Sequence, residues 1–235
     1  MEFRAKIHEH GELTLTMSTP DGDLMVVNSA RVSFAAKHDT MTLGDEKLIV
    51  YLVKNKHDSP LRHVLMTFRI KAPEFVMRQW YKHIIGACFT PTGYTEPDHA
   101  WNEMSGRYVE YKEEFYIPDK VRVQSKDNKQ ATLDESIPEE NTAIGILRDS
   151  TKSAWMDYQR LLELGVGREQ ARMVLPLSFY TEVIWTASLQ AVLNFISLRD
   201  HPHAQKEIRD YAIAMKEMVE KVAPVTMKAW NKHRV

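Results

Sequence analysis

The chain has 235 residues, of which 43% are hydrophobic and 27% are charged, as is usual for a soluble globular protein. Lysine and arginine together number 31 and aspartate and glutamate 32, so bulk charge does not favour a nucleic-acid or membrane partner. No apolar stretch approaches the roughly 20 residues of a membrane span, and the first residues lack the apolar core of a signal peptide. We therefore expect a cytoplasmic protein, and the single cysteine, Cys88, suits a reducing compartment.

The N-terminal half alternates strand patterns with helix patterns. Apolar and polar residues alternate over 13–17, which predicts a half-buried strand, and residues 20–22 read Pro-Asp-Gly, which is typical of a turn. From 45 to about 55 the apolar residues recur every three or four positions, which predicts a helix. Alternation returns over 64–71 and predicts a second strand, and Pro73 fits the first turn of a helix that follows it.

The middle of the chain is irregular. Glycines and prolines interrupt residues 84–102, which we interpret as a loop. Residues 108–117 are rich in tyrosine and phenylalanine, which favours a strand, and the polar stretch 119–141 lacks any period, which predicts an exposed loop. Apolar residues at helical spacing over 144–162 then predict a helix, with Gly165 as its C-cap.

The C-terminal half is predicted to be helical. Residues 181–198 are apolar on nearly all sides, which predicts a buried central helix, and 208–222 have the pattern of a last amphipathic helix that stops before Pro224. The sequence contains no internal repeat or linker. We therefore predict a single α+β domain over 1–235, in which a small antiparallel sheet packs against several helices.

The common motifs of catalysis are missing from the sequence. It has no phosphate-binding loop of the nucleotide-triphosphatase kind, no Rossmann glycine fingerprint and no paired-cysteine metal site. The run His201-Pro202-His203 has a proline between its histidines and no cysteine partner nearby. We interpret it as surface histidines and predict no metal.

Polar side chains inside otherwise apolar helices are more informative. Gln190 and Asn194 are four residues apart and share a helix face, and a buried amide needs a partner, which is either another helix or a ligand. Arg199 follows at the end of that helix, and Arg172 lies among the apolar residues of 170–176. Each guanidinium must pair, either in an internal salt bridge or with a carboxylate, phosphate or nucleobase carbonyl of a ligand.

The run 101–108 reads Trp-Asn-Glu-Met-Ser-Gly-Arg-Tyr. Serine and glycine let backbone N–H groups approach an anion, and Arg107 adds a positive charge, so the run could cradle a phosphate. A plain turn would also contain Ser105 and Gly106. Pattern alone leaves both interpretations open.

Motifs of one known enzyme family occur in order along nearly the whole chain. They lie at 29–34, 57–60, 68–73, 78–83, 103–108, 114–118, 168–176 and 193–205. Together they resemble the flavin-dependent thymidylate synthases. The resemblance implies a homotetramer with active sites between subunits, FAD as cofactor, and reductive methylation of dUMP to dTMP. Methylene-tetrahydrofolate would donate the carbon, and NADPH would reduce the flavin that supplies the hydride.

Carried over position by position, the resemblance assigns the candidate site residues. Arg199 matches an arginine held against the uracil, where a guanidinium can stabilise negative charge as C5 becomes nucleophilic, so it is the predicted catalytic residue. The predicted dUMP-binding residues are Gln79, Glu103, Met104, Ser105, Gly106, Arg107, Arg172 and Arg199. The predicted FAD-binding residues are Ser59, Lys82, His83, Ile84, Gln190, Asn194 and His203. His57 matches a histidine near the flavin, where the folate and nicotinamide stack.

The flavin positions depart from the family pattern, whereas the nucleotide positions keep it. The family's Arg-His-Arg is Lys82-His83-Ile84 here, and Glu103 lies further along than usual, so residues 85–101 contain an insertion. The other departures are Arg62, Ser188 and Gln190, where Glu, Asn and Arg are usual. Either the inserted loop covers the site and replaces the lost contacts, or it is a surface insertion and flavin binding is weaker.

Two other functions remain open from the sequence. Altered flavin contacts could change the hydride step, so that C5 of a uridine nucleotide is modified differently, for example by hydroxymethylation. The chain could also be a degenerate homologue that binds a nucleotide without turnover. Flavin uptake and product identity separate these alternatives.

Overall fold

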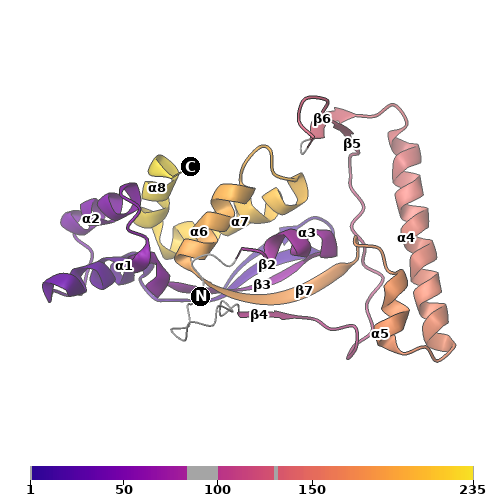
Figure 1. Ribbon diagram of the computed structural model, residues 1–235, viewed down its shortest axis with the longest axis horizontal. Helices are drawn as coiled ribbons and strands as arrows, with labels where there is room; N and C mark the ends of the chain where they lie inside the picture. The colour runs from indigo at the N-terminus through magenta and orange to yellow at the C-terminus, as the bar shows by residue number, and fades with distance from the viewer. Residues whose placement is uncertain (1, 84–99, 130–131, 235) are drawn as a thin grey trace.

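A computed structural model describes residues 2–83, 100–129 and 132–234 (Figure 1). Its main sheet has the strand order β1-β2-β3-β7-β4, and every neighbouring pair is antiparallel. The strands are β1 (Phe3–Ile7), β2 (Gly11–Ser18), β3 (Leu65–Pro73), β4 (Ala100–Glu103) and β7 (Tyr180–Ser188). The predicted α+β class, with an antiparallel sheet and a largely helical C-terminal half, is confirmed.

Helices cover one side of the sheet and extend the molecule at both ends (Figure 1). The helix bounds are α1 (Gly22–Arg31), α2 (Leu43–Lys54), α3 (Glu74–Trp80), α4 (Glu140–Glu163), α5 (Arg168–Ala171), α6 (Leu189–Arg199), α7 (Lys206–Val222) and α8 (Pro224–His233). Three short 3₁₀ helices are η1 (Val32–Phe34), η2 (Ser59–His63) and η3 (Arg172–Val174). The α1, α2 and α8 helices gather at one end, and α4 and α5 lie at the other.

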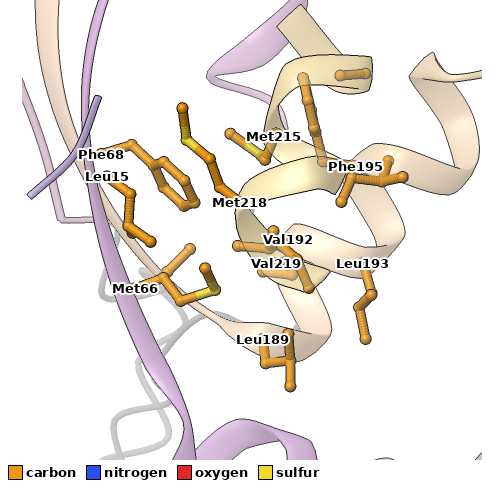
Figure 2. Packing of buried hydrophobic residues seen from close by; sticks show 14 of the residues in the cluster. Leu15, Met66, Phe68, Leu189, Val192, Leu193, Phe195, Met215, Met218 and Val219 are labelled. Atoms are coloured by element: carbon orange, nitrogen blue, oxygen red, sulfur yellow. The ribbon is translucent and has the colours of Figure 1, made fainter. Parts of the chain in front are cut away.

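The core lies between the sheet and helices α6 and α7. Met66 and Phe68 of β3 point toward these helices and meet Val192 and Phe195 of α6 and Met215 of α7 (Figure 2). All five side chains are fully buried. Their alternate spacing along β3 and their spacing of three or four along α6 explain why these segments form a strand and a helix. Trp80 of α3 stacks on Phe195, which ties α3 to the same core.

The opposite face of the sheet is polar. Arg69 donates a hydrogen bond to Glu182 across the β3–β7 pair at 2.8 Å, and Lys71 forms an ion pair with Glu114 at 2.7 Å. An antiparallel sheet with one apolar and one polar face gives the alternating sequence pattern seen in β3.

A second, smaller apolar cluster forms where α4 and α5 meet the segment after β4. It contains Tyr111, Phe115, Tyr158, Ala171 and Leu175. Within α4 the buried residue is Tyr158, whose hydroxyl accepts a hydrogen bond from the Tyr111 N–H at 3.3 Å. The α4 helix is therefore held to the protein along a narrow line, and most of its surface is exposed.

Several predicted elements are confirmed. The helix predicted over 45–55 is α2, which begins with a capping box between Thr42 and Asp45 and ends at the predicted C-cap, Asn55. The second predicted strand is β3, and the helices predicted after Pro73 and over 144–162 and 208–222 are α3, α4 and α7. Gly165 has a φ of 82°, the left-handed conformation expected after a helix end.

The predicted buried helix over 181–198 is wrong in its first half. Residues up to Ser188 form β7, and the helix α6 begins only at Leu189, where the Ser188 hydroxyl accepts a hydrogen bond from the Ala191 N–H at 3.3 Å. The first half is rich in β-branched and aromatic residues, which favour a strand. Ile184 places an apolar side chain on the exposed face of the strand, so the continuous apolar run of 183–185 hides the alternation and resembles a buried helix.

Four further expectations need correction. Residues 108–117 form no strand, and Phe115 makes only an isolated bridge to Phe179. The predicted loop 119–141 contains a two-stranded sheet of β5 (Arg122–Gln124) and β6 (Thr132–Ser136). The predicted loop 84–102 includes the start of β4, and its residues 84–99 lie outside the described part of the chain, as do Cys88 and most of the predicted insertion. The helix predicted to be the last is followed by α8, because Pro224 begins a new helix.

Candidate functional site

The predicted site residues are distributed over two cavities. The first, here called the Arg199 cavity, has a volume of about 500 Å³ and lies at the C-terminal end of α6. Its lining residues are Lys82, His83, Ala191, Asn194, Ser197, Leu198, Arg199, Trp230 and Arg234. The buried core positions the side chains from α6, because this helix packs its apolar residues against the sheet. The structure thus brings together four predicted residues, Lys82, His83, Asn194 and Arg199.

Arg199 is held by His83. The Arg199 Nε donates a hydrogen bond to His83 Nε2 at 3.1 Å, so Nε2 must be the unprotonated ring nitrogen. Burial, together with the positive charge of Arg199, lowers the pKa of His83 to about 4. Burial also lowers the pKa of Arg199. At neutral pH a neutral imidazole therefore orients a charged guanidinium, and the described residues give its Nη groups no hydrogen-bond partner.

Gln190 is buried but does not line the Arg199 cavity. Its Oε1 accepts a hydrogen bond from Arg62 Nε at 2.6 Å, and its Nε2 donates to Asp58 Oδ2 at 3.2 Å. Of the two partners expected for a buried amide, another part of the protein or a ligand, these contacts agree with the first: the Gln190 amide joins two elements of the fold. The neighbouring His57 and Ser59 are exposed and line neither cavity.

A further predicted flavin residue, His203, lies apart from the Arg199 cavity. His203 is exposed, and its backbone N–H donates to His201 Nδ1 at 3.2 Å. Ile84 lies outside the described residues. Within the described chain, no three histidine, cysteine, aspartate or glutamate residues are grouped to hold a metal ion.

The second cavity, here called the Arg172 cavity, has a volume of about 1120 Å³. It lies between α3, the end of β4 with the turn that follows, and the α5–η3 segment. Its lining residues are Glu74, Arg78, Glu103, Met104, Ser105, Arg107, Tyr111, Glu169, Gln170, Arg172, Met173, Leu177 and Phe179. Pairing of β4 with β7 directs the chain from Glu103 onward toward this place. Five predicted dUMP residues, Glu103, Met104, Ser105, Arg107 and Arg172, therefore meet here.

The turn at 105–108 is closed by its own backbone. The Tyr108 N–H donates to the Ser105 carbonyl at 3.0 Å. Gly106 donates its N–H to the Tyr111 hydroxyl at 3.2 Å, and a Cβ on Gly106 would lie 2.3 Å from Tyr111 Cε2. Glycine is therefore needed here for the close packing of Tyr111, and its N–H is already used within the protein. This turn can therefore contribute the positively charged side chain of Arg107 to an anion-binding site.

In the described part of the chain, the Arg172 cavity contains arginine side chains without hydrogen-bond partners next to two neighbouring carboxyl groups. Among the described residues, neither Arg172 nor Arg78 has a salt bridge or a side-chain hydrogen bond. Burial and the negative charge of Glu103 together raise the pKa of Glu74 to about 7, although Arg78 and Arg172 oppose the shift. Glu103 itself accepts a hydrogen bond from the Thr181 hydroxyl at 2.9 Å. The cavity thus combines unpaired guanidinium groups with a carboxyl pair that can hold one proton near neutral pH.

The structure separates two residues that the sequence assigned to one ligand. In a single chain, no described residue lines both cavities, and Arg199 and Arg172 lie in different ones. Gln79 lines neither cavity and donates to Gln205 at 2.6 Å. Each cavity therefore presents part of the predicted site.

Sequence reasoning missed several residues of these cavities. Glu74 follows Pro73 at a helix start, where an acidic residue is expected for the helix dipole alone, so it gave no signal. Trp230 and Arg234 come from α8, a helix that the sequence interpretation did not include. Arg78 was included only as part of the motif at 78–83. Its place directly before an expected binding residue, Gln79, was the one available clue.

No helix in the described part of the chain combines the length and the apolar character needed to cross a membrane. The longest, α4, is amphipathic and carries charged residues along its length.

Comparison with known proteins gives consistent matches. A family profile described as "Thymidylate synthase complementing protein" matches residues 14–225. A flavin-dependent thymidylate synthase from Thermosipho melanesiensis is 38% identical over 233 residues, which cover 99% of this chain and 94% of that protein. A protein of the same name from Thermus thermophilus is 42% identical over 211 residues, which cover 90% of this chain and 72% of that protein.

A solved structure has the same fold. The UMP/dUMP methylase PolB from Streptomyces cacaoi, bound with 5-Br dUMP, matches with a TM-score of 0.83 and 31% identity, over 98% of this chain and 99% of that chain. Sequence and fold agree along nearly the entire chain, so the resemblance drawn from the motifs is confirmed. The chain belongs to the flavin-dependent thymidylate synthase family of enzymes.

Proposed function

We propose that this enzyme converts dUMP to dTMP by reductive methylation, with methylene-tetrahydrofolate as carbon donor, NADPH as reductant and FAD as cofactor. The observation that carries the proposal is the grouping of Arg107, Arg172, Glu103 and Ser105 around one cavity of about 1120 Å³. Family membership, and a related methylase bound with 5-Br dUMP, support a pyrimidine nucleotide as the ligand.

The Arg172 cavity has the chemistry to hold a nucleotide. Arg172, Arg78 and Arg107 supply guanidinium groups, which bind phosphate with two parallel hydrogen bonds. Phe179 and the other apolar lining residues supply surface for a base or sugar, and Glu103, fixed by Thr181, supplies an acceptor. We assign dUMP to this cavity.

The Arg199 cavity fits part of a dinucleotide such as FAD. The cationic side chain of Lys82 suits an anionic pyrophosphate, and the amide of Asn194 can hydrogen-bond to the cofactor. Trp230 provides apolar surface beside them. A volume of about 500 Å³ lies within the usual range of ligand sites but accommodates only part of so large a cofactor. When bound, the flavin supplies hydride-transfer chemistry.

In this proposal Arg199 acts on the uracil. His83, neutral because its pKa is lowered to about 4, accepts from Arg199 Nε and so directs the guanidinium without competing for its charge. A fixed guanidinium in a partly buried site stabilises negative charge that develops on the ring as C5 becomes nucleophilic. We therefore propose Arg199 as the catalytic residue of the chain.

A site shared between subunits reconciles the two cavities. Since Arg199 and Arg172 line different cavities of one chain, both can meet a single nucleotide if two copies associate. We propose a homotetramer in which the Arg172 cavity of one subunit faces the Arg199 cavity of another.

UMP is a second candidate substrate. The related PolB is described as a UMP/dUMP methylase and was solved with 5-Br UMP as well, at 31% identity and a TM-score of 0.81. A ribonucleotide would differ from dUMP by a single hydroxyl group in the cavity. The preference is measured by comparing kcat/KM for the two nucleotides.

The test is turnover with C5-tritiated nucleotide, FAD, NADPH and methylene-tetrahydrofolate. Release of tritium with dTMP as product is the expected result. Tritium release with a hydroxymethylated product would establish the other C5 modification instead. Purified protein that takes up no FAD and releases no tritium would contradict the proposal and favour a degenerate, nucleotide-binding homologue.

A further inference from the structure

The last turn of α8 forms a wall of the Arg199 cavity. Trp230 and Arg234 both line it, and the Arg234 guanidinium lies over the Trp230 ring at 4.5 Å. Trp230 Nε1 donates to the Ser197 hydroxyl at 2.7 Å, and Ser197 in turn donates to the Leu193 carbonyl of α6 at 3.0 Å. The end of the described chain is therefore attached to the helix that carries Asn194 and Arg199.

Arg234 also reaches a second element. Its Nη1 donates to Asp58 Oδ1 at 3.0 Å and its Nη2 to Asp58 Oδ2 at 3.1 Å, so the pair is bidentate. The two side chains are only 15% and 16% exposed, which makes the pair stronger than a surface ion pair. Asp58 precedes η2 and follows His57, so the contact ties the end of α8 to the segment predicted to lie beside the flavin.

Gln190 completes the connection. Its Nε2 shares Asp58 Oδ2 with Arg234, and its Oε1 accepts from Arg62 of η2. The side chain of Gln190 is buried, and both ends of its amide are satisfied. Arg62, Gln190, Asp58 and Arg234 thus form one continuous polar network, called here the Asp58 network. It joins η2, the first turn of α6 and the last turn of α8.

We propose that Arg234 is a positioning residue that acts through Asp58 and Gln190 to hold the wall of the Arg199 cavity in place. The ligand whose affinity it sets is the anionic dinucleotide assigned there, so this inference rests on the proposed function. Asp58 does not line the cavity and can act on the ligand only through its partners. An effect of Asp58 on ligand binding is therefore the signature of positioning.

The experiment measures FAD affinity by quenching of flavin fluorescence and dUMP affinity by calorimetry. Asp58→Asn and Arg234→Gln should each weaken FAD binding roughly tenfold, in line with coupling energies of interacting neighbours, and change dUMP affinity less than twofold. Because both residues belong to one network, the double variant should bind FAD no more weakly than the weaker single variant. The matched control is Lys232→Gln, an exposed cation two residues earlier, which should bind FAD like the wild type.

Arg234→Lys separates positioning from direct charge. Lysine keeps the positive charge but cannot make both hydrogen bonds to Asp58, so it should bind FAD nearly as weakly as Arg234→Gln. A lysine variant with wild-type FAD affinity would show that charge alone matters and would overturn the inference. Unfolding midpoints measured in parallel identify a variant that has lost its fold.

Two outcomes distinguish this inference from the proposed function. A wild-type protein that takes up no FAD contradicts the proposed function and the ligand assigned here. A wild-type protein that binds FAD, with Asp58→Asn and Arg234→Gln within twofold of it, overturns the inference alone. Multiplicative losses in the double variant would likewise show that the two residues act independently.

Discussion

The two cavities differ in how far their charged groups are organised before any ligand arrives. In the Arg199 cavity the Arg199 guanidinium is fixed by His83, and the walls include residues of α6 and α8, which pack in the main core. In the Arg172 cavity the guanidinium groups of Arg172 and Arg78 have no partner among the described residues, and the walls are a turn and short helices. We infer that the first cavity is preorganised for charge that develops during reaction, whereas the second is completed by the ligand it binds.

The largest expected effect on activity comes from a substitution in the Arg199 cavity. Arg199→Ala should lower kcat by about 100- to 1000-fold, as does removal of a fixed donor at developing negative charge. Tritium release from C5-labelled dUMP measures it. Arg160→Ala, which removes an exposed arginine of α4, is the matched control and should keep full activity. Full turnover by Arg199→Ala would refute the role given to this residue.

In the Arg172 cavity, removal of an arginine should mainly weaken the binding of dUMP. Arg172→Ala should raise KM for dUMP roughly tenfold or more, because a hydrogen bond to a charged group is lost, while kcat changes less. Arg168→Ala is a suitable comparison, since Arg168 begins α5, the short helix directly before Arg172, but pairs with Glu110 instead of lining the cavity. A fall in kcat with unchanged KM would place Arg172 in the chemical step instead.

The turn in the Arg172 cavity can be tested through stability. Gly106→Ala places a Cβ 2.3 Å from Tyr111 Cε2, so Tyr111 must shift, and we expect a loss of about 1–3 kcal/mol in the free energy of unfolding. Denaturant titration measures it. Gly145→Ala, at a helical position with open space around the new Cβ, should instead add roughly 0.5–1 kcal/mol. Equal stability of Gly106→Ala and the wild type would disprove the packing role of this glycine.

The smallest expected effect is a dependence of stability and dUMP affinity on pH, which arises from Glu74 in the Arg172 cavity. The pKa of Glu74, about 7 in the folded protein, lies above its ordinary value of 4.5. Its protonated form therefore stabilises the fold fully below pH 4.5, and this contribution is lost as the pH rises through 7. Ionised Glu74 also repels an anionic nucleotide, so dUMP affinity should fall a few-fold between pH 6 and 8.

Glu74→Gln isolates this contribution from the titration of the nucleotide phosphate itself. The variant should retain high dUMP affinity at pH 8 and show a flatter pH profile in calorimetric titrations. A profile that is the same in the variant and the wild type would exclude Glu74 as the titrating group.

Fold prediction from the sequence succeeded where a pattern is local. The spacing of apolar residues within α2 and α7 identifies these helices because the signal and the structure occupy the same residues. Residues 181–198 misled because Ile184, an apolar residue on the exposed face of β7, hides in the sequence the alternation that the burial of this strand shows. The short β4 depends on its pairing with β7, which a local pattern does not encode.

The same distinction applies to the site. Ser105 and Arg107 come from one motif, and the resemblance placed Arg172 with them, as the structure does in one cavity. Contacts between distant segments were not predictable: His83 and Arg199 are 116 residues apart, and Asp58 and Arg234 are 176 apart. Their meeting depends on how α6 and α8 pack, and α8 itself was missing from the sequence interpretation.

The most direct test of the shared site is complementation between two impaired variants, assayed at a dUMP concentration well below KM, where both lose activity. Arg199→Ala and Arg172→Ala are co-expressed with different tags, and mixed oligomers are purified through both tags and assayed for tritium release. If each active site takes Arg199 from one subunit and Arg172 from another, random assortment restores about a quarter of wild-type activity. Mixed oligomers no more active than either variant alone would contradict the account, because both arginines would then have to come from the same chain.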